Sequence, residues 1–277
     1  MAIHAQMNET APAGEPRLSS GVLSPDMKYT VRLAVPSYLT DGLQRLTPAS
    51  FMDLAQEMAY VAAARLHFGY DELGSRGTAW VLSRMYFRFL RTPRWREVVD
   101  LSTWHKGAQG PFYLRDFRMA DLQGEPLVEG TSSWVVLDVE NRRLVRSSEV
   151  VEMVPENTVC PDAAVSEPAP RLVFPAGAEA REVAVHPVRY SDVDLLGHTN
   201  NTRYVMWSMD GLDYDLVSQQ PVRDVCVNFN RETRPGEQVR LSRCRDAAGA
   251  WFVRGDVEGK NAFLARFRFG DEAALQP

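Results

Sequence analysis

The sequence predicts an α+β fold in which one structural unit occurs twice, and three observations lead to this prediction. Each half of the 277-residue chain starts with a strand, passes through a polar loop into one helix, and continues as alternating strands. A helix followed by consecutive hairpins must bury its apolar face on the sheet that they form. A proline-rich stretch without strand or helix periodicity separates the halves, at Pro155, Pro161, Pro168, Pro170 and Pro175.

The first half is expected to begin with a strand at 29–36 and to enter its helix after a loop. Thr47 is a candidate N-cap, and Pro48 suits the first helical position because its missing N–H is not needed there. The helix is expected to stop at Gly69, since glycine readily adopts the left-handed conformation of many helix ends. Its predicted core face is Phe51, Leu54, Met58 and Val61. Strands should follow at 81–89, 98–106, 113–121 and 132–138.

The second half repeats this order. A strand at 182–190 leads through a loop into a short helix, whose apolar residues have helical spacing: Val205, Met209 and Leu212. Strands should follow at 222–230, 238–244, 251–258 and 262–269. The predicted organisation is a tail at 1–26, a first domain at 27–154, a linker at 155–181 and a second domain at 182–277.

Composition excludes several classes of protein. Apolar residues make up 45% of the chain and charged residues 24%, which is typical of a globular protein. The formal charge of −5 argues against a basic coat for nucleic acid. The three cysteines form no CxxC pair, so a reducing, cytoplasmic compartment is expected, and no apolar run is long enough for a membrane span. Neither a metal-ligand cluster nor a phosphate-binding glycine loop is present in the sequence, so no metal and no cofactor are expected.

Several blocks of sequence, in order, resemble one known family. They are WVLSRMYFRFLRTPRW (80–95), RDFRMADLQGEPL (115–127), TSSWVVLDVENRRL (131–144), YSDVDLLGHTNNTRYVMW (190–207) and VNFNRET (227–233). Together they make the chain similar to the acyl-acyl-carrier-protein (acyl-ACP) thioesterases of plant plastids and bacteria, which are tandem hotdog folds. The resemblance implies a double hotdog, with two helices each wrapped by an antiparallel sheet.

The resemblance also implies an activity: hydrolysis of fatty acyl-ACP thioesters by water attack, giving free fatty acid. The partner would be acyl carrier protein with its acyl-phosphopantetheine arm. Carried over residue by residue, the catalytic set is Asp194, His198 and Glu232. Glu232 would be the general base, with its pKa raised by burial in the acyl channel.

The residues themselves leave alternatives open around the second helix. A helix N-terminus can stabilise an oxyanion, and His198 can relay a proton near neutral pH. Asp194 can fix the histidine tautomer or orient water, but it can equally form an Asx-turn, and His198 can be an ordinary loop residue. Asn200 and Asn201 are candidates for positioning the substrate.

The chain departs from the family pattern at two positions. Thr233 stands where the family usually has cysteine, and Cys226, inside a predicted strand, is expected in the core, so water is the predicted nucleophile. Leu196 stands where the plant pattern has asparagine, so that polar contact must come from Asn200, Asn201, backbone N–H groups or nothing.

Two other functions remain alternatives: an acyl-CoA thioesterase, and a non-catalytic acyl-thioester-binding double hotdog. Chain-length preference cannot be deduced, and both a monomer and a homodimer are compatible with the duplicated halves. An acidic carrier protein would need a local basic surface. One candidate surface is Arg84, Arg88, Arg91, Arg94 and Arg96.

Overall fold

The protein is described by a computed structural model, which covers residues 18–145, 150 and 154–270. Most of the predicted tail, 1–17, and the end of the second domain, 271–277, lie outside the described residues. Residues of the predicted tail that are described form a short 3₁₀ turn, Leu18–Ser20, and the strand β1, Val22–Leu23. β1 pairs with β2, so these residues extend the sheet of the first half.

The first half contains the predicted strand, helix and meander. Its elements are β2 (Tyr29–Ala34), α1 (Pro48–Arg65), α2 (Tyr70–Gly74), β3 (Thr78–Phe89), β4 (Val98–Gln109), β5 (Phe112–Ala120), β6 (Pro126–Asp138) and β7 (Arg143–Leu144). The second half repeats the order with β8 (Arg181–Pro187), α4 (Asn201–Asp210), α5 (Tyr214–Gln219), β9 (Val222–Phe229), β10 (Gln238–Arg245), β11 (Trp251–Val257) and β12 (Lys260–Phe269). Short 3₁₀ turns lie at Ser37–Leu39, Glu156–Thr158 and Tyr190–Asp192.

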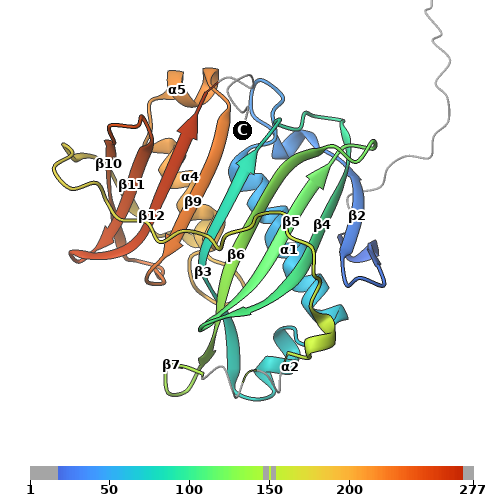
Figure 1. The fold of residues 1–277 in the computed structure, drawn as a ribbon. Helices are drawn as coiled ribbons and strands as arrows, with labels where there is room; N and C mark the ends of the chain where they lie inside the picture. Colours follow the sequence, from blue (N-terminus) through green and yellow to red (C-terminus); the bar gives the residue numbers. More distant parts are fainter. Residues whose placement is uncertain (1–17, 146–149, 151–153, 271–277) are drawn as a thin grey trace, which may run out of the picture.

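The strands of both halves form one antiparallel sheet of 12 strands, in the order β1-β2-β4-β5-β6-β3-β9-β12-β11-β10-β8, with β7 beside β6. The halves join where β3 pairs with β9, from Arg84 opposite Asn228 to Arg88 opposite Asp224. Both α1 and α4 lie on one face of this sheet, and the segment between the halves crosses the other face (Figure 1). The predicted α+β double hotdog is confirmed, and its two sheets are continuous.

The main core lies between the helices and the sheet. All four residues of the predicted helix face are buried, with Phe51 and Met58 fully inaccessible. Phe51 packs edge-on against Phe87, with ring centroids 4.9 Å apart. None of the described helices combines the length and the apolar character that a membrane crossing requires.

The predicted start of α1 is confirmed, but its predicted end is wrong. Thr47 accepts a hydrogen bond from the Ser50 N–H, and Pro48 is the first helical residue. The helix ends at Arg65, and the left-handed residue that follows is His67, with φ of 60°. Gly69 has φ of −81° and is the N-cap residue that precedes α2. Glycine is needed there because an added Cβ would lie 2.9 Å from Ala64 Cα.

Candidate active site

Two segments of the second half build the candidate site: the loop between β8 and α4, and the chain that follows β9. Within the loop, the Asp194 N–H donates to His198 O at 2.9 Å, and Val193 forms a bridge with Thr199. The turn between them requires a left-handed residue, which is Gly197 with φ of 77°. This closed turn places His198 just before α4.

Buried hydrogen bonds tie this loop to the chain after β9. The Thr199 N–H donates to Thr233 O at 2.9 Å, and the two threonine hydroxyls are 2.6 Å apart. The Tyr204 hydroxyl, which comes from α4, accepts the Thr233 N–H at 3.1 Å and lies 3.0 Å from Thr233 Oγ1. Because Thr233 is completely buried, these bonds fix its neighbour Glu232 relative to the loop.

The structure brings His198 and Glu232 together. His198 Nε2 lies 3.3 Å from Glu232 Oε2. The other carboxylate oxygen, Oε1, accepts hydrogen bonds from Arg234 at 2.8 Å and from Arg142 at 3.0 Å. Arg142 lies in the turn between β6 and β7, so the first half contributes a side chain to a site built by the second half.

The environment of Glu232 contradicts the expectation of a raised pKa. Partial burial pushes the pKa of Glu232 upward, but hydrogen bonds from Arg234 and Arg142 and the proximity of His198 outweigh it. The pKa therefore lies below its ordinary value. About a third of the carboxylate side chain is exposed, so the predicted deep burial in a channel is not observed either.

Of the other three predicted site residues, Asp194 and Asn200 use their side chains in structural contacts. Asp194 Oδ1 accepts the Leu196 N–H at 2.9 Å, which is an Asx-turn. Among the described residues, the Asp194 carboxylate makes no hydrogen bond to the His198 ring. Asn200 is the N-cap of α4, and its Oδ1 accepts from the Thr202 N–H at 2.9 Å and from its hydroxyl at 3.0 Å. Asn201 is the first helical residue and is half-buried, and its side-chain amide makes no hydrogen bond within the described part of the chain.

The departures from the family pattern have clear structural settings. Leu196 lies in the exposed part of the loop, with 47% of its surface accessible. Thr233 is buried and bonded to Thr199 and Tyr204, so it holds the loop against the chain after β9. Cys226 is fully buried, and burial raises the pKa of its thiol to about 12, so it is no thiolate nucleophile. Within the described ranges, no group of three or more His, Cys, Asp or Glu side chains could hold a metal ion.

Sequence reasoning missed the arginines and the support beneath the loop. Arg234 is two residues from Glu232, a spacing that could have indicated a charge partner. Arg142 had no sequence signal. Below the loop, Asp192 Oδ2 accepts the Arg189 N–H at 2.8 Å and lies 3.1 Å from His186 Nε2. This second imidazole–carboxylate pair anchors the start of the loop.

Four of the five arginines proposed as a basic surface are paired with acids or lie away from the candidate site. Arg88 pairs with Glu129 at 2.6 Å, and Arg91 pairs with Glu97. Arg94 and Arg96 follow β3, whereas Glu232 follows β9. Because these two strands are antiparallel, Arg91, Arg94 and Arg96 lie at the end of the sheet opposite the candidate site.

The comparisons with known proteins identify the family. Residues 26–154 match the acyl-ACP thioesterase N-terminal domain, and residues 177–262 match the C-terminal domain of the same family. Oleoyl-acyl carrier protein thioesterase 2 of Arabidopsis thaliana is 27% identical over 252 residues, which cover 83% of this chain and 66% of the relative. A palmitoyl-acyl carrier protein thioesterase of the same plant is 26% identical over 58% of this chain and 40% of its own length. The chain thus spans less than two thirds of these chloroplastic relatives.

Solved structures share the fold. A 12:0-ACP thioesterase from Umbellularia californica superposes with a TM-score of 0.77 at 20% identity, covering 88% of this chain and 98% of that one. An acyl-ACP thioesterase from Bacteroides thetaiotaomicron gives a TM-score of 0.74 at 20% identity, with the same coverage. Two family models in the expected order, together with this fold, lead to one assignment: the chain belongs to the acyl-ACP thioesterase family.

Proposed function

We propose that this protein hydrolyses fatty acyl-ACP thioesters to free fatty acid and carrier protein, with His198 and Glu232 as the reacting pair. The observation that carries the proposal is the 3.3 Å distance between His198 Nε2 and Glu232 Oε2 at the start of α4. Family membership supports the reaction class, and the names of the relatives support the carrier-bound substrate.

The electrostatics assign the two side chains different roles. Arg142 and Arg234 favour the ionised form of Glu232, which makes it a weak base and a strong hydrogen-bond acceptor. An imidazole exchanges protons near neutral pH and is the better proton acceptor. A water molecule beside the pair, within hydrogen-bond distance of both groups, would donate to both, and the carboxylate would stabilise the imidazolium as it forms.

The reaction then proceeds by addition of water and loss of the thiolate. The water oxygen attacks the thioester carbonyl while one of its protons passes to His198 Nε2. The carbon–sulfur bond of the tetrahedral intermediate breaks, and the leaving thiolate takes the proton from the imidazolium. Free acid and thiol result. The N-terminus of α4 supplies partial positive charge for the oxyanion, and Asn201, whose side chain is not used in capping, is the proposed positioning residue. We assign Asp194 and Asn200 to holding this geometry.

The test compares Glu232→Gln with the wild type on a panel of acyl-ACP substrates, with released fatty acid as the readout. The variant keeps the volume of the side chain and removes its charge, so kcat should fall by about 10²- to 10⁴-fold. A matched control is Glu182→Gln, because Glu182 forms an exposed ion pair with Arg240 on a different part of the sheet. Wild-type turnover by Glu232→Gln would contradict the assignment.

Two other functions remain to be tested: an acyl-CoA thioesterase, because both carriers present the same pantetheine arm and carbonyl, and a non-catalytic binding protein, because Leu196 offers no polar contact to a substrate carbonyl. An acyl-CoA thioesterase would show equal kcat/KM on matched acyl-CoA and acyl-ACP. A non-catalytic binding protein would bind the thioester tightly and release no fatty acid above the rate in buffer. Equal kcat/KM on both carriers excludes carrier-protein selectivity, and the absence of any release excludes hydrolysis.

The proposed partner and setting follow from the same reaction. Acyl carrier protein delivers the thioester on its phosphopantetheine arm, and hydrolysis by water needs no cofactor. Arg142 and Glu232 come from the same chain, so the proposed site needs no residue from a second copy and a monomer is sufficient. Analytical ultracentrifugation would distinguish a monomer from a homodimer. We place the reaction in the cytoplasm on the grounds of cysteine usage, which fractionation of the source cells would test.

A further inference from the structure

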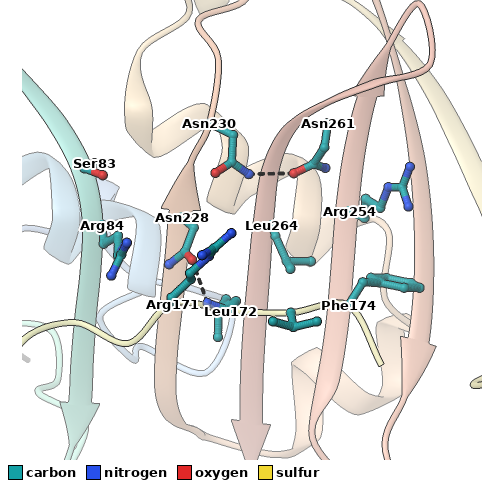
Figure 2. A pocket seen from close by; sticks show the side chains of 11 residues that line it. Ser83, Arg84, Arg171, Leu172, Phe174, Asn228, Asn230, Arg254, Asn261 and Leu264 are labelled. Carbon is teal, nitrogen blue, oxygen red and sulfur yellow. Dashed lines mark hydrogen bonds between the residues drawn. The ribbon is translucent and has the colours of Figure 1, made fainter. Parts of the chain in front are cut away.

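A pocket of about 480 Å³ lies on the sheet face opposite the helices. Side chains from β3, β9, β11 and β12 form its floor, and residues 171–174 of the segment between the halves form its wall (Figure 2). Its volume is within the range of small-molecule sites. Nothing in the proposed reaction uses this pocket.

The pocket wall is fixed by buried hydrogen bonds. Asn228 is only 4% exposed, its Oδ1 accepts the Leu172 N–H at 2.6 Å, and its Nδ2 donates to Pro170 O at 2.9 Å. The predicted linker is therefore a bound part of the second half at this point. Side chains of residues 171–174 are therefore held in place before a ligand binds, which lowers the entropic cost of binding.

The pocket carries positive charge without matching acids. Arg84 and Arg171 form no ion pair with any carboxylate in the described part of the chain, and Arg84 is held against the Phe112 ring at 4.9 Å. They lie on either side of Asn228 in Figure 2. The carboxylates on the same face are already occupied: Asp224 pairs with Arg266 at 2.9 Å, and Asp256 pairs with Arg254 at 2.7 Å.

Two such arginines beside one cavity favour an anion, and guanidinium groups match the geometry of phosphate. Other lining groups suit an organic chain attached to that phosphate. Leu172, Phe174 and Leu264 are apolar. Asn230 donates its Nδ2 to Asn261 Oδ1 at 2.6 Å, while its carbonyl oxygen has no donor among the described residues and remains free for an amide.

The pocket lies close to the candidate active site along the chain. Asn230 and Asn228 precede Glu232 by two and four residues. At about 3.3 Å per residue of extended chain, Asn228 lies within about 13 Å of Glu232. An extended arm whose thioester is at Glu232 can therefore follow the end of β9 onto this face.

We propose that Arg84 and Arg171 bind the phosphate of the phosphopantetheine arm while its thioester lies beside the His198–Glu232 pair. This inference rests on the proposed function, because it places the substrate arm of that same reaction. The phosphate of the arm would bind the two arginines, and its amides would bind Asn230. Its geminal methyl groups would pack on the apolar floor. Acyl-ACP and acyl-CoA share this chemistry, so both carriers would use the pocket.

The test compares two substrates with the same acyl group, acyl-4′-phosphopantetheine and acyl-pantetheine, which lacks the phosphate. Wild-type protein should show the lower KM for the first. Arg171→Gln and Arg84→Gln should each raise that KM about tenfold, the loss of about one charge-assisted hydrogen bond, and leave kcat and the acyl-pantetheine KM unchanged. Arg171 is exposed, so its variant carries the test if Arg84→Gln does not fold. The control is Arg245→Gln, an exposed arginine that lies over Trp251.

Equal wild-type KM values for the two substrates would overturn the proposal, and so would variants that raise both KM values alike. An effect of the variants on acyl-CoA but not on acyl-ACP would also overturn it, because the arginines would then bind the nucleotide of coenzyme A. If neither substrate is hydrolysed, the proposed function fails, and calorimetric titration of 4′-phosphopantetheine decides this inference separately. Arg171→Gln should then weaken binding about tenfold, whereas equal binding to wild type and variant would refute it.

Discussion

The two halves build the same loop before their main helices, but only one of them carries reactive groups. In the first half, the Asp41 N–H donates to Arg45 O at 2.9 Å; in the second, the Asp194 N–H donates to His198 O at 2.9 Å. Both aspartates also accept the N–H two residues later, at 2.9 Å in each case. The Asx-turn is therefore part of the duplicated scaffold and does not by itself indicate catalysis.

The comparison extends to the chain that faces each loop. The Leu46 N–H donates to Pro93 O at 2.8 Å, as the Thr199 N–H does to Thr233 O at 2.9 Å. Thr92 therefore occupies the position that Glu232 has in the second half. The residue equivalent to His198 is Arg45, whose guanidinium bonds to Asp41 and to the Ser218 carbonyl at 2.9 Å. The first loop has become a contact to α5, whereas the second retains an imidazole and a carboxylate.

The largest effect is expected from exchanging the residue at which the loops differ. His198→Arg makes the second loop resemble the first and replaces a proton acceptor by a group that stays protonated. Fatty acid release should fall by at least about 10²-fold. The reverse change, Arg45→His, removes the bonds to Asp41 and α5, so it should lower the melting temperature without adding activity. Substantial turnover by folded His198→Arg would contradict the role of the imidazole.

A second prediction concerns Tyr204, whose hydroxyl holds the chain after β9 from α4. Phe51 occupies in α1 the position that Tyr204 has in α4, so Tyr204→Phe removes a hydroxyl that the first half never had. It leaves the buried Thr233 N–H without its 3.1 Å partner. The free energy of unfolding should decrease by about 1–3 kcal/mol, measured by urea denaturation. The exposed Tyr214 provides the control, since Tyr214→Phe should have no measurable effect.

These differences explain how far the sequence could lead. Alternating and helical periodicity predicted the strands and both main helices, because burial on one face imposes those patterns. The end of α1 was mispredicted because Gly69 is required for its contact with Ala64, and not for a left-handed conformation. The sequence blocks predict that His198 and Glu232 share a site, and the structure places their side chains 3.3 Å apart. Arg142 lies 90 residues from Glu232, and only the pairing of β6, β3 and β9 brings it there.

A third prediction tests the turn itself. Gly197 has φ of 77° and Gln44, its equivalent, has φ of 63°. An added Cβ at Gly197 meets no atom within 4 Å, so Gly197→Ala isolates the cost of the backbone conformation. That cost should be about 1 kcal/mol of stability in urea denaturation, with turnover largely retained. A much larger loss would show that the turn tolerates less than its counterpart in the first half.

The smallest effect on stability is expected at the contact that joins the halves. Arg142 and Glu232 form a partly exposed pair, 3.0 Å apart, so Arg142→Gln should cost no more than about 1 kcal/mol. The effect of Arg142→Gln on the pH dependence of activity should be larger than its effect on stability. The folded pKa of Glu232 lies below its ordinary value, so the ion pair contributes above the unfolded pKa and is lost as pH falls through the folded pKa.

Removing Arg142 takes away one of the groups that lower this pKa, so the pKa of Glu232 should rise. The lowest-pH step in the acid limb of kcat/KM, at which Glu232 takes up a proton, should therefore move to higher pH in Arg142→Gln. Arg143→Gln is the matched control, because Arg143 follows Arg142 as the first residue of β7 and pairs with Asp138 at 3.3 Å. An acid limb that stays in place, or moves equally in both variants, would mean that the first half holds Glu232 without controlling its charge. A shift confined to Arg142→Gln would show that the first half, which has Arg45 and Thr92 at the positions of His198 and Glu232, takes a direct part in setting the protonation of the second.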